Sequence, residues 1–282
     1  MTVSPSTTPV QRPHLSAELH ERRERVFLLL AGIFLGSMAM LNIIGITRFI
    51  HIGPLALAVG VLPYPLTFLC TDLISELYGR RRANWLVFTG LIVNLVVIGT
   101  VWLGQALPPI SEAARPEWLP EGSWNPPPWQ MLSLTEPVPL PNGAVLEGSG
   151  SLFYIIYACT AGAVVASMFA YMAAQFCDVA LFHFWKKLTK GKHLWLRNNG
   201  STLVSQLVDS TMVIMITFGG AFFRGEKKFV ELLVLIGSGY LFKMTVALLD
   251  TLPFYAGVHY LGRYLQIDPR TEHHIDREET TG

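Results

Sequence analysis

Charged residues are scarce in this chain. Asp, Glu, Lys and Arg make up 15% of its 282 residues, whereas hydrophobic residues make up 51%. An ordinary soluble domain carries about 25% charged residues, so the composition excludes a protein whose surface faces only water. The net charge is +1, which excludes the strongly basic field that many nucleic-acid-binding proteins carry. We therefore expect a surface that faces lipid and no direct contact with nucleic acid.

Cysteines and the common catalytic motifs are equally sparse. The three cysteines, Cys70, Cys159 and Cys177, are odd in number and lie in apolar segments, which argues against a disulfide framework. The sequence contains no GxxxxGK[ST] loop and no GxSxG motif. These absences disfavour ATP hydrolysis and α/β-hydrolase chemistry within this chain. We expect no bound cofactor, no metal and no enzymatic activity.

Apolar runs long enough to cross a membrane are abundant. A hydrocarbon core of about 30 Å needs roughly 20 apolar residues of α-helix. The sequence shows no strands of alternating apolar and polar residues, so we expect the chain to cross the membrane as α-helices. The predicted transmembrane helices cover residues 26–46, 53–70, 84–107, 152–177, 201–223 and 229–261. The predicted fold class is an all-α integral membrane protein with six transmembrane helices, the last of which can kink at Pro253.

The basic residues indicate the orientation. Fifteen of the 21 fall in segments that lie on the same side as the two ends of the chain, five fall on the opposite side, and Lys243 lies within the last predicted helix. Because Lys and Arg are retained on the cytoplasmic side, both termini are predicted to be cytoplasmic. The predicted organisation is a disordered tail over 1–25, a membrane domain over 26–262 and a second cytoplasmic tail over 263–282.

A long outer loop is predicted at residues 108–150. It holds ten of the eighteen prolines together with Trp118, Trp124 and Trp129, a composition that excludes a long helix. Two interpretations remain open for this loop. It can lie at the headgroup level with its tryptophans as interfacial anchors, or it can cover an outward-facing opening.

Polar side chains within the predicted helices are the candidate functional residues. An unpaired charge in hydrocarbon costs at least about 2.5 kcal/mol, and several of these side chains recur at helical spacing, which places them on one face of each helix. The candidate site residues are Asn42, Asp72, Tyr171, Gln175, Asp178, Gln206, Asp209 and Lys243. Polar stripes on three helices imply a shared polar interior.

Two local patterns add detail to this candidate site. Pro63 and Pro65 free backbone carbonyls ahead of Asp72, a pattern that is tolerated where the backbone lines a cavity. We therefore expect a binding cavity with Asp72 near its cytoplasmic end. Asp209 and Lys243 are predicted at nearly the same depth on consecutive helices, so we expect them to form an ion pair that avoids two isolated buried charges.

Four motifs carry a resemblance to a known family. They are PLTFLCTDLISELYGRRRA, ASMFAYMAAQFCDVALF, LWLRNNGSTLVSQLVDS and YLFKMTVALLDTLPFY. In this order they resemble the queuosine precursor transporter family, over about residues 36–262. Its members import 7-cyano- or 7-aminomethyl-7-deazaguanine for tRNA modification. The resemblance implies a multi-pass protein of the bacterial inner membrane, with a deazapurine substrate and the lipid bilayer as its partners. Whether it forms a homodimer stays open.

The implied substrate accounts for the carboxylates. A 7-deazaguanine presents its N1–H and its exocyclic amine side by side, and a carboxylate accepts both hydrogen bonds. Asp72, Asp178 and Asp209 all qualify, and the sequence does not rank them. Two alternatives remain: a substrate-binding membrane subunit of an ATPase-driven importer for a related base or vitamin, and an intramembrane aspartyl enzyme. The driving force of transport is also left open.

Overall fold

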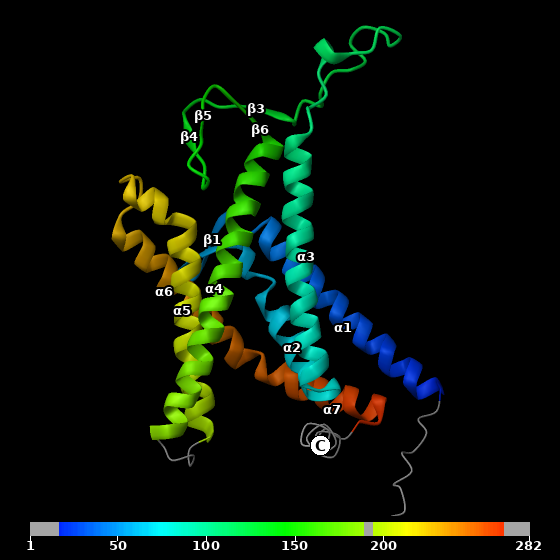
Figure 1. Cartoon of the computed structure of the whole chain (residues 1–282), viewed down its shortest axis with the longest axis vertical. Helices are drawn as coiled ribbons and strands as arrows, with labels where there is room; N and C mark the ends of the chain where they lie inside the picture. Colours follow the sequence, from blue (N-terminus) through cyan, green and yellow to red (C-terminus); the bar gives the residue numbers. More distant parts are fainter. Residues whose placement is uncertain (1–16, 189–193, 268–282) are drawn as a thin grey trace, which may run out of the picture.

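The computed structural model describes residues 17–188 and 194–267, and this part of the chain is mostly helical (Figure 1). The helices are α1 (Ala17–Ile43), α2 (Tyr64–Tyr78), α3 (Arg80–Ala106), α4 (Leu152–Leu188), α5 (Leu194–Phe223), α6 (Phe229–Leu249) and α7 (Thr251–Leu265). The strands are β1 (Phe49–Ile52), β2 (Leu55–Ala58), β3 (Met131–Ser133), β4 (Val138–Pro139), β5 (Val145–Leu146) and β6 (Ser149–Ser151). Two 3₁₀ turns cover Val59–Val61 and Glu112–Ala114.

Five helices in the described ranges are long and apolar enough to cross a membrane. They are α1, α3, α4, α5 and the nearly continuous pair α6–α7. The prediction of an all-α membrane protein agrees with this arrangement. Near the amino terminus, α1 begins at Ala17, so residues 17–25, which were assigned to a disordered tail, are helical in the structure.

The prediction of a single helix over 53–70 is wrong. The chain instead forms the antiparallel hairpin β1–β2, turned at Gly53 with φ +57°, and then a 3₁₀ turn before α2 begins. Pro63 occupies the N-cap of α2 and Pro65 lies in its first turn. Proline lacks an N–H and is tolerated in the first turn of a helix but not in its interior. The two prolines therefore start a helix at a point where hydrophobicity alone predicted its middle.

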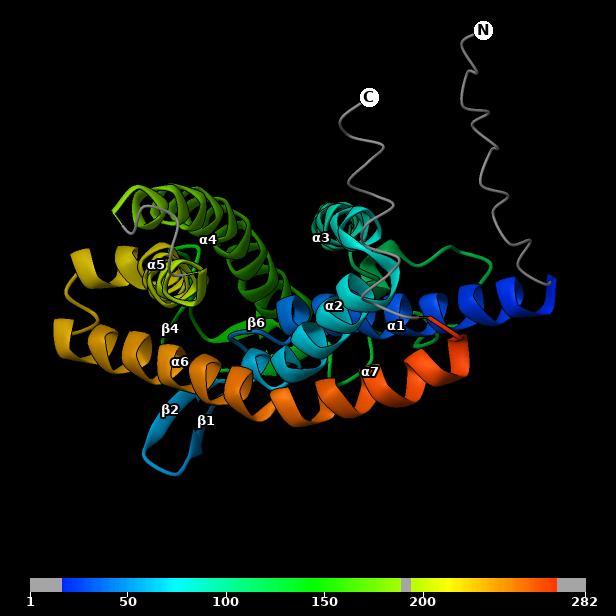
Figure 2. The same ribbon diagram turned by 90° about the horizontal axis from the view of Figure 1, so that it is seen from below.

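The helices form two groups, which are seen from below in Figure 2. One group is the pair α4–α5, whose helices contact each other along their length. The other contains α1, α2 and α3, with α7 packed against α2. Helix α6 contacts α5 and continues into α7, so the last two helices connect the groups. The buried apolar residues between α1, α2 and α3 include Leu30, Phe34, Leu73, Ile74 and Leu86.

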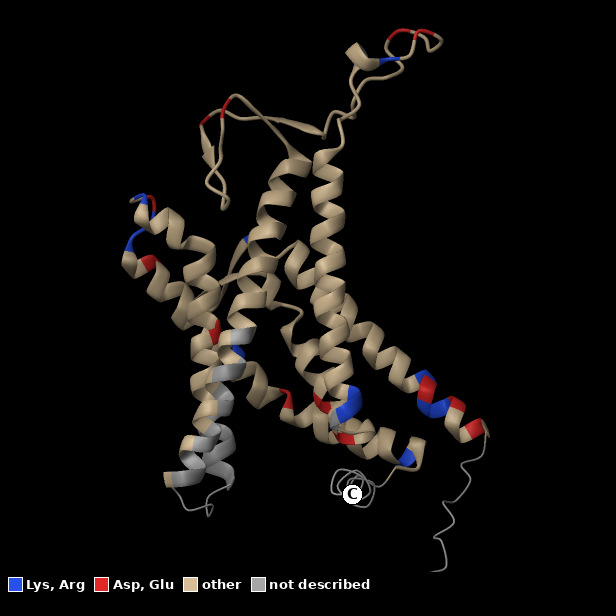
Figure 3. Cartoon of the chain, viewed as in Figure 1, with Lys and Arg blue, Asp and Glu red and all other residues tan. Residues whose placement is uncertain are grey.

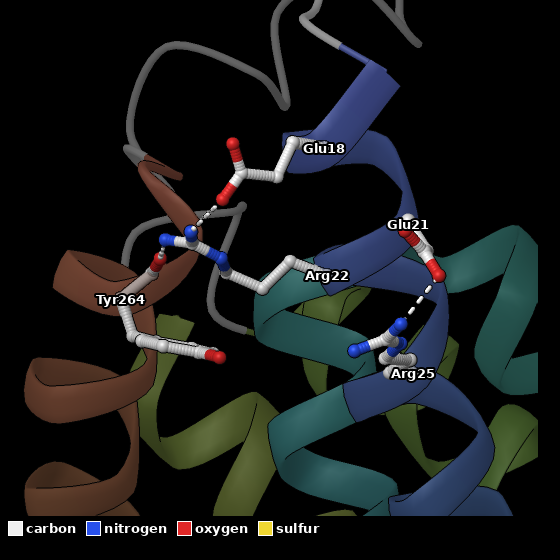
Figure 4. A network of polar contacts seen from close by, with 5 residues as sticks. All are labelled: Glu18, Glu21, Arg22, Arg25 and Tyr264. Carbon is white, nitrogen blue, oxygen red and sulfur yellow. Dashed lines mark hydrogen bonds and ion pairs between the residues drawn. The ribbon is translucent and has the colours of Figure 1, made fainter.

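Arginines join the start of α1 to the end of α7. Arg23 donates from Nε to the Leu265 carbonyl at 3.0 Å and from Nη2 to the Gln266 carbonyl at 2.8 Å. Figure 4 shows Arg22 between Glu18, at 3.0 Å, and the ring of Tyr264. A cation near the carbonyls that end a helix is favourable because those groups have no partners within the helix. Both ends of the described chain therefore lie on one side of the molecule.

Arginines gather at this same end, as Figure 3 shows for the start of α1, the junction of α2 with α3, and α7. Arg82 of α3 also reaches Glu24 of α1 at 2.9 Å. A smaller basic group lies at the opposite end, in the turn between α5 and α6. There Arg224 donates to Glu226 at 2.6 Å, and this hydrogen bond holds the pKa of the Glu226 carboxyl below its ordinary value.

Two further features of the fold lie where the sequence contains proline: the break between α6 and α7, and the long outer loop. The last predicted helix divides into α6 and α7 around Asp250, three residues before Pro253. The long loop over 108–150 forms two small sheets, in which β3 pairs with β6 and β4 pairs with β5. This loop lies at the end of the molecule opposite the start of α1 and the end of α7 (Figure 1). The arginines at that other end, which include Arg22, Arg23 and Arg82, are called the arginine cluster below.

Candidate functional site

A cavity of about 410 Å³ lies between the two helical groups. Helices α1 to α5 each contribute residues spaced three, four or seven positions apart, as one face of an α-helix requires. Its polar and aromatic lining residues are Phe34, Asn42, Tyr64, Thr67, Phe68, Thr71, Asn94, Ser167, Tyr171, Ser205, Gln206 and Asp209. The cavity thus brings together part of two predicted stripes, Ser167 and Tyr171 of α4 with Gln206 and Asp209 of α5.

Two buried asparagines join α1 to α3 at the wall of this cavity. Asn42 is 1% exposed and Asn94 is 2% exposed. The Asn42 Nδ2 donates to Asn94 Oδ1 at 2.9 Å and to the Met38 carbonyl at 3.1 Å. Because a carbonyl can only accept, the contact with Met38 fixes the orientation of the Asn42 amide. Asn42 Oδ1 has no partner, and a buried acceptor left unpaired costs about 1–3 kcal/mol.

An ion pair beside the cavity joins α5 to α6. Lys243, which is 5% exposed, donates from Nζ to Asp209 Oδ2. The same ammonium lies 5.0 Å from the centre of the Tyr64 ring on α2, within the range of a cation–π contact. Three helices are thus linked through one lysine, and the predicted pair of Asp209 with Lys243 is confirmed.

A second, smaller cavity of about 100 Å³ adjoins the first. It lies between the β1–β2 hairpin, α5 and α6, and both cavities are bounded by Leu41, Tyr64, Ser167 and Val213. Phe49 of β1 packs against Phe218 of α5 with ring centres 5.8 Å apart. The hairpin that replaces the predicted helix is therefore a wall of this second cavity.

The structure places the predicted site residues in three groups. Asn42, Tyr171, Gln206 and Asp209 line the central cavity, and Lys243 is held beside it by Asp209. Asp72 is exposed and does not line either cavity. Gln175 and Asp178 belong to α4, but their side chains lie outside the described part of the structure.

Two residues outside the candidate set prove central to the geometry. Asn94 carries the contact with Asn42, and Tyr64 contacts Lys243. An amide in an apolar helix signals interhelical contact as readily as ligand binding, so the sequence pattern could point to Asn94 without identifying its partner. Among the described residues, no group of three His, Cys, Asp or Glu side chains is arranged to hold a metal ion.

A bundle of long apolar helices around a polar central cavity is the architecture of a multi-pass membrane transporter. Residues 58–257 match the family described as "Putative vitamin uptake transporter", and the chain belongs to that family. This is a family of transporters and not of enzymes.

The comparison with individual proteins agrees with this assignment. A Bacillus subtilis (strain 168) protein described as "Probable queuosine precursor transporter" is 25% identical over 227 residues, which span 79% of this chain and 80% of that protein. The resemblance that the four motifs carry is thereby confirmed. No solved structure matches this chain.

Proposed function

We propose that this protein imports a queuosine precursor, 7-cyano- or 7-aminomethyl-7-deazaguanine, across the bacterial inner membrane for tRNA modification. The observation that carries the proposal is the central cavity, which combines aromatic rings with amides and a carboxylate in about 410 Å³. Cavities of roughly 300–1,000 Å³ hold small ligands. A flat base with several hydrogen-bonding groups suits this lining better than a long apolar vitamin does.

We assign recognition of the base to Asp209. Of the three candidate carboxylates, Asp209 lines the cavity, Asp72 does not, and the side chain of Asp178 is not described. Its Oδ2 is paired with Lys243, so Oδ1 remains to accept the donors on the guanine-like edge. Gln206 lies one turn from Asp209 on the same helix. Its side-chain amide can donate hydrogen bonds to the carbonyl oxygen and the ring nitrogen of the base.

Aromatic rings hold the plane of the base in this proposal. Tyr64 and Phe68 form an edge-to-face pair on α2 with centres 5.6 Å apart, and Tyr171 lines the cavity from α4. Aromatic faces stack on bases of any sequence because every base has a π face. Stacking therefore supplies affinity, and the hydrogen bonds of Asp209 and Gln206 supply selectivity.

The orientation belongs to the same proposal. The end that carries the arginine cluster and both described termini is assigned to the cytoplasm, because basic residues are retained there. The loop over 108–150 is then external. We propose that the chain acts in the plasma membrane without a bound cofactor.

The test is uptake of labelled 7-cyano-7-deazaguanine into liposomes that contain only the purified chain. We expect saturable uptake by the wild type, and a loss of about tenfold or more for Gln206→Leu, because one hydrogen bond to a buried polar group is removed. Gln105→Leu at the exposed end of α3 is the matched control and should transport normally, since Gln105 is exposed and does not line the cavity.

Two outcomes would change the assignment. Binding of the base without uptake, with uptake restored when an ATPase partner is added, would make the chain a substrate-binding subunit of a larger importer. Failure to bind either deazaguanine, by a protein that remains folded, would rule out this substrate class.

A further inference from the structure

Asp250 lies at the break between α6 and α7, where it ends one helix and precedes the other. Its side chain makes no capping hydrogen bond to α7. The residue is 8% exposed, and its Oδ2 is buried without a hydrogen-bond partner. A buried carboxylate oxygen without a hydrogen-bond donor has nothing to balance its charge, which is unfavourable for the ionised form.

A second carboxylate lies near Asp250 on a neighbouring helix. Helix α2 packs against both α6 and α7, and its Asp72 carboxylate lies within electrostatic reach of Asp250. Cys70 of α2 also lies within electrostatic reach of Asp250. No ion pair joins a cation of the described residues to Asp72 or Asp250.

Other titratable groups on the surrounding helices are engaged elsewhere or turned outward. Lys243, two turns earlier on α6, is paired with Asp209 and contacts Tyr64. On α7, Tyr255 and His259 are exposed. The arginines of α1 contact the far end of α7, at Tyr264 to Gln266. Asp72 and Asp250 therefore form an acidic pair, one member exposed and the other buried.

We propose that Asp250 is the proton-binding site of the transporter and that transport is coupled to inward movement of a proton. In each cycle the Asp250 carboxylate takes up one proton and becomes a neutral acid, and it later returns that proton to water on the cytoplasmic side. Asp72 relays the proton, because it is exposed and lies only about 9 Å along α2 from the end of that helix at Tyr78.

The position of the pair connects it to the central cavity. Thr71, which precedes Asp72 in α2, lines the cavity, as do Tyr64 and Phe68 of the same helix. Lys243 lies about 10 Å from Asp250 along α6. Neutralising Asp250 removes the repulsion between α2 and the α6–α7 junction, so protonation favours close packing of the helices that wall the cavity. Broken helices at such positions are a recurring feature of ion-coupled carriers.

The coupling is tested with the purified full-length chain in liposomes that enclose a pH-sensitive dye. With labelled 7-cyano-7-deazaguanine outside, an acidic exterior should raise wild-type accumulation several-fold, and the dye should report proton entry that depends on the base. In Asp250→Asn the ratio of uptake with the gradient to uptake without it should fall to about one. Asp72→Asn should slow proton entry, whereas Glu147→Gln in the exposed outer loop should behave as the wild type.

A second measurement needs no substrate. A carboxylic acid that the folded protein keeps protonated stabilises the fold at acidic pH, and this contribution is lost as the pH rises. The thermal midpoint of the wild type in detergent should therefore fall from mildly acidic to mildly alkaline pH, and Asp250→Asn should reduce that dependence while Glu147→Gln retains it.

The outcomes separate this inference from the proposed substrate. Wild-type uptake that ignores the proton gradient or follows a sodium gradient overturns proton coupling and leaves the substrate assignment standing. A gradient response in Asp250→Asn equal to that of the wild type also overturns it. If the wild type transports no deazaguanine, the substrate proposal has failed, and the thermal measurement alone decides the proton site: an unchanged pH dependence in Asp250→Asn rejects it.

Discussion

At the scale of single residues, the buried polar side chains of this protein differ in whether they have a hydrogen-bonding partner. Lys243 and Asp209 satisfy each other, and Asn42 and Asn94 share one hydrogen bond. Asp250 finds no partner in the described structure. Because a buried group without a partner is costly in proportion to its charge, these residues respond very differently to substitution.

The first prediction concerns the pair of Asp209 with Lys243. Asp209→Asn or Lys243→Met alone should destabilise the protein by about 3–5 kcal/mol, because each leaves one uncompensated buried charge. The double variant should recover much of that stability, since no charge then remains unpaired. The measurement is a double-mutant cycle on unfolding in detergent. Strictly additive losses would show that the two charges respond to other groups.

The second prediction concerns selectivity at Asp209. Adenine presents an unprotonated ring nitrogen where guanine presents N1–H, so the free Asp209 oxygen would face a lone pair. The mismatch should cost about 1–3 kcal/mol, and adenine should compete with 7-cyano-7-deazaguanine at least about fivefold more weakly than guanine does. Competition assays in wild-type liposomes measure this difference. Equal competition by the two purines would remove the carboxylate from the recognition of the base.

At the scale of elements, the β1–β2 hairpin is the feature that shapes the cavities. The 3₁₀ turn that follows the hairpin lies against the segment after α1 so closely that Gly60 N donates to the Gly45 carbonyl at 3.0 Å. A Cβ added at Gly60 would lie 2.7 Å from the Gly45 Cα and 2.7 Å from the Leu41 carbonyl oxygen. Both obstructing atoms belong to backbone, so they cannot move aside as a flexible side chain would.

The third prediction follows from this contact. Gly60→Ala should destabilise the protein by about 1–3 kcal/mol, because it overpacks a backbone contact, and it should also lower uptake, because the hairpin walls the smaller cavity. Gly99→Ala is the matched control: position 99 lies within α3 with nothing within 4 Å of an added Cβ, so this variant should be neutral or slightly stabilised. Thermal unfolding of the two variants should rank them in this order, and equal midpoints would contradict the close approach.

At the scale of the whole molecule, two helical groups enclose the cavity and are connected by α6–α7. The arginine cluster gathers the start of α1 and the end of α7 at one end, opposite the long loop. A carrier needs its binding site to be reached from either side in turn. The contacts between α2 and α6–α7, where the acidic pair lies, connect the two groups and are the place where such a change can be controlled.

The fourth prediction tests the orientation. In a variant whose native cysteines are replaced by alanine, Glu147→Cys should react with a membrane-impermeant thiol reagent added to intact cells. Glu21→Cys, near the start of α1 and the arginine cluster, should react only after the cells are permeabilised. Both positions are exposed, so accessibility differs only by side. Labelling of Glu21→Cys from outside would invert the proposed topology.

The amino-acid sequence by itself determined the apolar helices α1, α3, α4, α5 and α6–α7 and the pairing of Asp209 with Lys243. These follow from local hydrophobicity, helical spacing and the position of each residue along its helix. The tertiary structure alone decided that residues 49–58 fold into a hairpin, that Asn42 contacts Asn94, and that Asp72 lies outside both cavities. Those outcomes depend on how each helix is rotated about its axis and on which neighbours it packs against, and packing between residues distant in the chain sets both.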